Sequence, residues 1–202
     1  MDTLQRSLVE FIQRQEMPAF FPALLRLVAK GEPVSLDELA AEGHTPVEQL
    51  DGWLRAQPGT DWAPDGRLLG FGLTQRETPH RFTVDGRTLF AFCAADTLLF
   101  PAVLGRPASV ESTCPATGRT VRLEVTQDAV ASLDPETAAV TQAALSGGSS
   151  DIRAQTCDLG HFYASAEAAA SWRAEHPDGD VRPVREFHAL GVEVERELGW
   201  VA

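Results

Sequence analysis

The sequence LFAFCAADTLLFP, from Leu89 to Pro101, is the most apolar run of this 202-residue chain. The run predicts a strand that leads directly into a helix beginning near Ala94. Cys93 and Asp96 are three residues apart, so the helix would place them on one face, about a turn apart. A thiol and a carboxyl group would then lie among aliphatic, aromatic and small side chains.

This pair of side chains has two interpretations. In the first, Cys93 is a small buried hydrophobe, and Asp96 is an early helix residue favoured by the helix dipole. In the second, the helix N-terminus lowers the pKa of Cys93, and the apolar, negatively charged surroundings raise the pKa of Asp96. Such a pair could bind a soft metal and transfer a proton near neutral pH. The remaining sequence has to distinguish these two interpretations of the Cys93–Asp96 pair.

Composition excludes several classes of protein. The chain has 29 acidic and 17 basic residues, a formal net charge of −12, which disfavours binding to nucleic-acid phosphates and anionic membranes. No run of eighteen apolar residues occurs, and the segment from Met1 to Arg6 lacks the basic and apolar regions of a signal peptide. We therefore expect a cytoplasmic protein. Its three cysteines are odd in number and widely spaced, which predicts free thiols rather than a disulfide framework.

The N-terminal third predicts a helical module. Residues 3–30 show helical periodicity, with a break at Met17-Pro18 and an end near Gly31. Ser35 and Glu38 form the pattern of a capping box that starts the next helix. A further helix is expected after a turn, with Thr45 as its cap and Glu48 completing a second capping box.

A hairpin around Asp65-Gly66 is expected to follow these helices. Helix, turn, helix and hairpin together predict a winged-helix-like module over about residues 20–75. Its second helix carries Glu48 and Asp51 and a single cation, Arg55, whereas DNA-reading helices present Arg, Lys or Asn. We therefore expect a structural module rather than a DNA-binding one.

The remainder of the chain predicts an α/β core with antiparallel strands. Residues 126–150 are expected to be rich in loops, with a short helix near residues 135–139 and a flexible segment at 147–150. The expected strands are 81–84, 88–91, 108–112, 120–125 and 160–165, and the expected helices are 166–175 and 187–198. The fold class is thus α+β, with a winged-helix-like domain over residues 1–79 packed on a mixed α/β core domain over residues 80–202.

Two familiar uses of cysteine fit the sequence poorly. A structural zinc site of three Cys and one His could be assembled, with Cys114, Cys157 and His161 among its ligands, but such sites usually take their ligands in close Cys-x-x-Cys pairs, and the sequence has none. Cys93 could instead be a nucleophile activated by His161 or His188, but the motifs of cysteine hydrolases are absent.

Soft-metal chemistry is the third use. Two thiolates that meet at one point bind a soft cation far better than oxygen ligands do. A carboxylic acid at the same point could protonate a metal–carbon bond. Cys93, Cys157 and Asp96 would meet these requirements if the fold brings them together.

The chain resembles the organomercurial (alkylmercury) lyase family in several separate blocks. The block FCAADTLLFPA, from Phe92 to Ala102, resembles the first signature of the family. Further similar blocks follow the family order at residues 72–78, 114–118, 151–157 and 161–165, and the resemblance covers roughly residues 20–200. It implies a winged-helix-like region packed on a mixed α/β core.

The resemblance also implies an activity and roles for individual residues. The family cleaves the carbon–mercury bond by protonolysis and gives a hydrocarbon and Hg(II). By position, Cys93 is the first thiolate, which captures mercury, and Cys157 is the second. Asp96 is the proton shuttle, which takes a proton from a thiol, delivers it to the leaving carbon and later helps to hold Hg(II). Cys114 matches a cysteine with a structural role.

The same resemblance implies that no cofactor is needed, that external thiols support turnover, and that Hg(II) passes to small thiols or to a mercuric reductase. The chain departs from the family at Phe92, where many members have Trp, and at Thr156 and Asp158, where an aromatic residue and a second cysteine are expected. Two alternatives remain: a thiol-based metal sensor whose winged helix binds DNA, and a catalytically silent relative.

Overall fold

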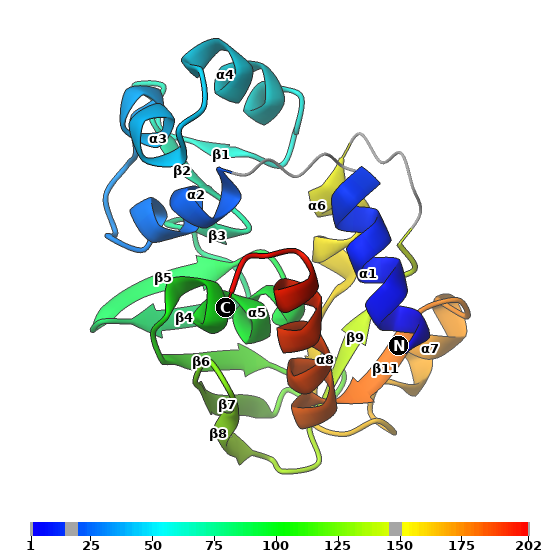
Figure 1. Ribbon diagram of the computed structural model, residues 1–202. Helices are drawn as coiled ribbons and strands as arrows, with labels where there is room; N and C mark the ends of the chain where they lie inside the picture. Colours follow the sequence, from blue (N-terminus) through cyan, green and yellow to red (C-terminus); the bar gives the residue numbers. More distant parts are fainter. Residues whose placement is uncertain (1, 15–19, 146–150, 202) are drawn as a thin grey trace.

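The computed structural model describes residues 2–14, 20–145 and 151–201, which form an eight-stranded and a three-stranded antiparallel sheet with helices around them (Figure 1). The strand order is β1-β2-β3-β5-β4-β6-β7-β8 in the larger sheet and β10-β9-β11 in the smaller. The helices are α1 (Thr3–Arg14), α2 (Phe21–Val28), α3 (Leu36–Gly43), α4 (Val47–Arg55), α5 (Ala94–Leu104), α6 (Ile152–Gln155), the 3-10 helix η1 (Cys157–Leu159), α7 (Ala170–Glu175) and α8 (Val184–Glu197). The strands are β1 (Asp61–Trp62), β2 (Leu68–Phe71), β3 (Leu73–Thr74), β4 (His80–Val84), β5 (Arg87–Ala91), β6 (Ala108–Thr113), β7 (Thr120–Val125), β8 (Val130–Asp134), β9 (Ala139–Gln142), β10 (Phe162–Tyr163) and β11 (Asp180–Pro183).

The N-terminal module has the predicted winged-helix-like order, with α2, α3 and α4 followed by the β1–β2 hairpin. The capping box of α3 is confirmed, because the Glu38 N–H donates to Ser35 Oγ at 3.2 Å and the Ser35 N–H donates to Glu38 Oε2 at 3.1 Å. The second capping box is wrong. The Thr45 hydroxyl donates to the Gly43 carbonyl at 2.9 Å, and α4 starts after Pro46 without a side-chain cap. The expected break at Met17-Pro18 lies outside the described residues.

The predicted hairpins of the core are confirmed, since β4 pairs with β5 and β6 pairs with β7. The larger sheet also continues from the N-terminal module into the core, because β3 pairs with β5. This pairing places the end of β5, and therefore the residues that follow it, at the junction of the two parts. The class is α+β, as expected.

Three expectations for the C-terminal half need correction. Residues 135–139 form no helix, because residues 135–138 make the turn between β8 and β9 and Ala139 begins β9. Val140 of β9 pairs with both Phe162 and Arg182. Helix α7 begins four residues later than expected, because Ser165 Oγ accepts from the Ala168 N–H in a separate turn. Helix α8 begins three residues earlier, at Val184. The segment 147–150, expected to be flexible, lies outside the described residues.

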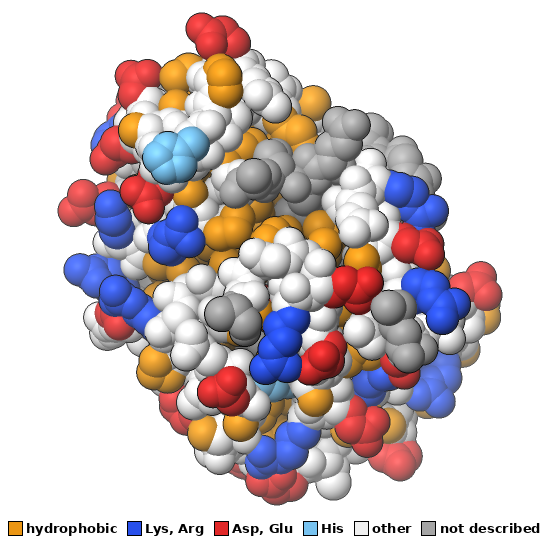
Figure 2. Space-filling view, viewed as in Figure 1, with side chains coloured by type: hydrophobic (Ala, Val, Ile, Leu, Met, Phe, Trp, Pro, Cys, Tyr) orange, Lys and Arg blue, Asp and Glu red, His pale blue; other side chains and the backbone are white. Residues whose placement is uncertain are grey.

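Helix α5 lies at the centre of the molecule, with α2, α8 and β9 packed against it. Nine of its eleven residues are buried, which explains why its sequence is apolar on almost every face. On the face shown in Figure 2, hydrophobic side chains gather near the centre and charged side chains surround them. None of the helices in the described part of the chain has the length and apolar character that a membrane crossing requires.

Candidate active site

The start of α5 fixes the relative positions of a thiol and a carboxyl group. Cys93 follows β5 in extended conformation and is the N-cap of a helix that begins at Ala94, as predicted. The Cys93 N–H donates to Asp96 Oδ2 at 3.2 Å, as in a capping box. The change from strand to helix therefore turns both functional groups to the same side.

Cys157 reaches the same place from a different segment. Asp151 caps the short helix α6 by accepting from the Ala154 N–H at 3.1 Å, and Cys157 opens the 3-10 helix that follows. The Ala94 N–H donates to the Gly160 carbonyl at 3.1 Å, which ties this segment to the start of α5. A Cβ on Gly160 would lie 3.1 Å from Cys93 Cβ, so glycine permits the close approach.

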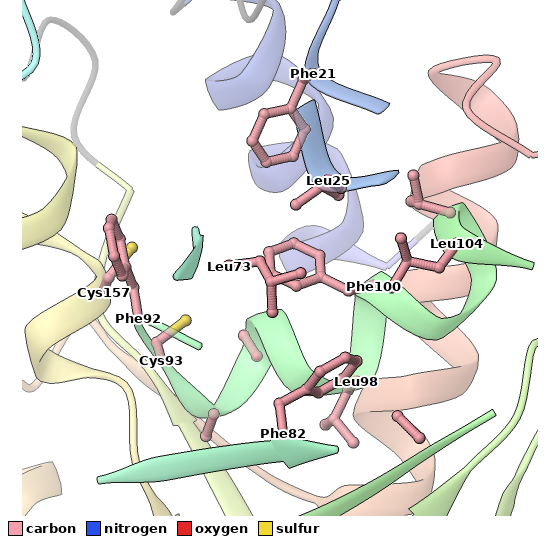
Figure 3. Packing of buried hydrophobic residues seen from close by; sticks show 14 of the residues in the cluster. Phe21, Leu25, Leu73, Phe82, Phe92, Cys93, Leu98, Phe100, Leu104 and Cys157 are labelled. Carbon is pink, nitrogen blue, oxygen red and sulfur yellow. The ribbon is translucent and has the colours of Figure 1, made fainter. Parts of the chain in front are cut away.

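Cys93, Asp96 and Cys157 form one cluster. Their two sulfur atoms and a carboxylate oxygen all lie within 4.8 Å of one another, and in the described part of the chain they are the one group of three or more such side chains that could hold a metal ion. Figure 3 shows Cys93 and Cys157 on neighbouring segments beside Phe92. The cysteines are 5% and 9% exposed. The three residues predicted from sequence are thus brought together in a largely buried place.

The environment of the cluster changes all three pKa values. Burial raises the pKa of Asp96 to about 7, in the direction expected from its apolar surroundings. The hydrogen bond with Cys157, burial and the charge of Asp96 raise the pKa of Cys93 well above its usual value. The hydrogen bond with Cys93 lowers the pKa of Cys157, but burial, Asp96 and Asp158 outweigh it and the pKa is raised. The prediction of a lowered pKa for Cys93 is therefore wrong, because the hydrogen bond with Cys157, burial and the neighbouring carboxyl group outweigh the helix N-terminus.

An apolar pocket extends from the cluster. Its walls come from α1, α2, α5 and α8 and from segments near β2 and β9, so residues far apart in the sequence meet there. Besides the cluster itself, the polar residues of the lining are Gln142, Thr156 and Glu195. The apolar and glycine residues of the lining are Leu8, Phe11, Ile12, Phe21, Phe71, Gly72, Phe92, Ala95, Leu99, Phe100, Leu145, Ile152 and Trp200.

Arg153 connects the site to the N-terminal module. Its guanidinium group lies 4.0 Å from the centre of the Phe92 ring, beside Cys93. The same group donates to the Gly59 carbonyl and to Asp61 Oδ1, both at 3.1 Å. Sequence reasoning did not give Arg153 this role, although it belongs to the block at residues 151–157.

The other cysteine and histidine candidates lie elsewhere. Cys114 is buried in a separate small cluster with Tyr163 and Trp172, in agreement with a structural role. His161 stacks on His80, with ring centres 5.9 Å apart, and His188 contacts the Thr126 carbonyl at 3.3 Å. In the described residues, no metal cluster combines Cys114, Cys157 and His161.

The predicted recognition helix does not favour DNA binding. Its single cation, Arg55, donates to Asp51 at 2.7 Å and lies over the ring of Trp62, 4.8 Å from its centre. All residues of α4 are described, and its only cation is therefore engaged within the module.

Comparisons with known proteins agree with this geometry. The family model for alkylmercury lyase matches residues 73–195, and the model for the helix-turn-helix domain of alkylmercury lyase matches residues 2–72. The chain is 42% identical over 183 residues to an alkylmercury lyase of Staphylococcus epidermidis, covering 91% of this chain and 82% of the relative. It is 44% identical over 174 residues to an alkylmercury lyase of Streptomyces lividans, covering 86% of this chain and 80% of the relative.

A solved structure shares the fold. The crystal structure of the mercury-bound form of MerB2 aligns with a TM-score of 0.74 and 22% identity, covering 96% of this chain and 99% of that chain. The likeness therefore extends over both the helical module and the core. The family models and the sequence relatives show that this chain belongs to the alkylmercury lyase family.

Proposed function

We propose that this protein cleaves the carbon–mercury bond of organomercurials with Cys93 and Cys157 as mercury-binding thiolates and Asp96 as the proton shuttle. The observation that carries the proposal is the meeting of two thiols and one carboxyl group within 4.8 Å at an apolar pocket. Thiolates supply the affinity for a soft metal. The pocket supplies space for an organic group that water solvates poorly.

In the first step, the Asp96 carboxylate takes the proton of a cluster thiol, and the Cys93 thiolate displaces the small ligand of the organomercurial. A mercury–sulfur bond forms, and the displaced ligand leaves with the electron pair of its bond to mercury. The raised pKa of both thiols keeps their protons available in the site, and the pKa of about 7 lets Asp96 accept one.

In the second step, the Cys157 thiolate also binds mercury, and its proton leaves with the displaced ligand. Two thiolates increase the electron density on mercury and give the bound carbon carbanion character. Protonated Asp96 then delivers its proton to that carbon, and the electron pair of the carbon–mercury bond forms the new carbon–hydrogen bond. The hydrocarbon departs, and Hg(II) stays on the two sulfur atoms with Asp96 as a further ligand.

Turnover in this scheme needs no cofactor, only an external thiol. Small thiols remove Hg(II) by ligand exchange at Cys93 and Cys157 and return the protons to both sulfur atoms. The exchange also passes Hg(II) to a mercuric reductase. Because the cycle consumes reduced thiols, we place it in the cytoplasm.

The departures from the family pattern lie next to this machinery. Phe92 receives the Arg153 guanidinium on its ring, and Asp158 Oδ1 lies 3.6 Å from Arg153 Nε. Thr156 lines the pocket. These residues border the three reacting groups without replacing any of them, so we propose that they affect the fit of the substrate rather than the bond that is cleaved.

The test is the release of benzene from a phenylmercury salt in the presence of excess thiol, measured by headspace gas chromatography. We expect benzene from the wild type and none above background from Cys157→Ser. The mercury content of both proteins is measured in parallel after dialysis. Mercury binding without benzene from the wild type would overturn the proposal and indicate a binding or sensing protein, whose DNA binding would then be measured.

A further inference from the structure

Glu195 is a buried carboxyl group that the proposed reaction does not use. Its side chain is 1% exposed, and neither carboxylate oxygen has a hydrogen-bond partner among the residues that the structure describes. Leaving a buried polar group without a partner is costly. Such a group in a functional pocket indicates that a ligand completes its hydrogen bonds.

The packing of α8 on α5 places Glu195 beside the reaction centre. The first half of α8 lies near the end of α5, because His188 contacts Thr126 and Gly105 lies beside Gln127. The two helices are therefore antiparallel. A Cβ on Gly191 would lie 2.3 Å from Leu99 Cδ2, so glycine lets the helices approach closely there.

Glu195 is one helical turn beyond Gly191, on the same face of α8. In an antiparallel pair this turn faces the start of α5, where Cys93 and Asp96 lie. Glu195 lines the same pocket as these residues, and it is the one ionisable group of the lining outside the cluster. Leu8, Phe11 and Trp200 supply apolar surroundings in this pocket.

We propose that Glu195 is a specificity residue for the organic group of the substrate: the pocket prefers an organomercurial that carries an amine or another hydrogen-bond donor to one that carries a carboxylate. This inference rests on the proposed lyase function. A donor on the organic group would satisfy the unpartnered carboxyl oxygens. An ammonium group would form a neutral pair with the Glu195 carboxylate, whereas a carboxylate would add a negative charge to a pocket that already holds two carboxyl groups.

The charge state of Glu195 agrees with this role. Burial raises the pKa of Glu195 to about 8, so beside a hydrocarbon group it retains its proton at neutral pH and adds no charge. A plain phenyl or alkyl group is therefore accepted. Glu195 thus stays protonated beside a hydrocarbon group and ionises beside an ammonium group.

The test uses three substrates that differ at one position: phenylmercury, 4-(aminomethyl)phenylmercury and 4-carboxyphenylmercury. For each, kcat/KM is measured from the released hydrocarbon and divided by the rate of its cleavage by acid in water, which removes the electronic effect of the substituent. We expect the wild type to prefer the amine to the carboxylate by about tenfold or more. Glu195→Gln should reduce this ratio by about tenfold.

The matched control is Glu197→Gln, which makes the same Glu-to-Gln replacement at an exposed position of the same helix. It should keep the wild-type ratio. A wild type that cleaves phenylmercury but shows no preference for the amine would overturn the inference and leave the lyase function intact. An unchanged ratio in Glu195→Gln would also overturn it. If Glu195→Gln does not fold, the wild-type ratio decides, and a wild type that releases no benzene refutes the lyase function itself.

Discussion

The Cys93–Cys157 pair and Cys114 are all buried free thiols, but they differ in what surrounds them. The pair lies beside Asp96 at a pocket, and its thiols have raised pKa values. Burial also acts to raise the pKa of Cys114, but hydrogen bonds from Thr117 and from backbone N–H groups outweigh it and lower the pKa. Among the residues that the structure describes, Cys114 belongs to no group of three or more side chains that could hold a metal ion.

Burial alone therefore does not identify a functional thiol in this protein. Two sulfur atoms and a proton-accepting group must converge, and the strand-to-helix turn at Cys93 and the close approach at Gly160 achieve this. Cys114, in contrast, packs against Tyr163 and Trp172 and forms part of the turn after β6.

The largest effect is expected from removing one thiol of the pair. Cys93→Ser should lower benzene release by about 1000-fold or more, because a hydroxyl group at this position is a poor ligand for a soft metal. Cys114→Ser is the matched control, and its kcat should stay within about threefold of the wild type, while the free energy of unfolding falls by roughly 1 kcal/mol. Equal losses of activity in the two variants would contradict the assignment of a catalytic role to Cys93 and a structural role to Cys114.

The next effect separates mercury binding from proton transfer. Asp96→Asn retains the size of the side chain but cannot carry the proton, so kcat should fall by about 100-fold or more. Both thiols remain, and we expect this variant to retain bound mercury after dialysis. Normal benzene release from Asp96→Asn would show that another group supplies the proton.

The pH dependence gives an intermediate effect. Asp96 must start as a carboxylate to take a thiol proton, and its pKa is about 7. The wild-type kcat/KM should therefore rise about tenfold between pH 6 and pH 8. Asp96→Asn shows the contribution of the external thiol alone, and a rise of the same size in that variant would exclude Asp96 as the titrating group.

The smallest effect is expected at the junction with the N-terminal module. Arg153→Met removes the contact with Phe92 and the bond to the buried carboxylate of Asp61. We expect the free energy of unfolding to fall by about 1 to 3 kcal/mol and kcat/KM to fall by only a few-fold, because no reacting group is lost. Chemical denaturation measures the free energy of unfolding, and steady-state kinetics measure kcat/KM. Arg173→Met, an exposed position in α7, serves as the control.

The sequence predicted the local part of the site. The three-residue spacing of Cys93 and Asp96 and the helix start at Ala94 follow from local rules, and they are confirmed. The approach of Cys157 depends on tertiary contacts over more than sixty residues of intervening chain. From the residues alone, the meeting of Cys157 with Cys93 was only a condition for soft-metal chemistry, and the family resemblance alone implied it, because no spacing rule connects such distant positions.

The errors have physical reasons of the same kind. Strand β9 is buried at all four of its residues, so its sequence lacks the alternation that marks a half-buried strand. Glu195 stands in a charged segment typical of an exposed helix face. The feature of the sequence that could have indicated its burial is the helical spacing of Val184, His188, Gly191 and Glu195. This spacing places all four on one buried face of α8.

The composition of the pocket wall has a consequence for biosynthesis. Leu8 and Trp200 line the same cavity, although almost the whole 202-residue sequence separates them. Cys93 and Cys157 precede Trp200 in the sequence, so both are synthesised before this wall residue. Until α8 and Trp200 pack, the pocket wall beside both thiols is incomplete. The packing of α8 and Trp200 therefore determines when the pocket begins to restrict which molecules reach the two sulfur atoms.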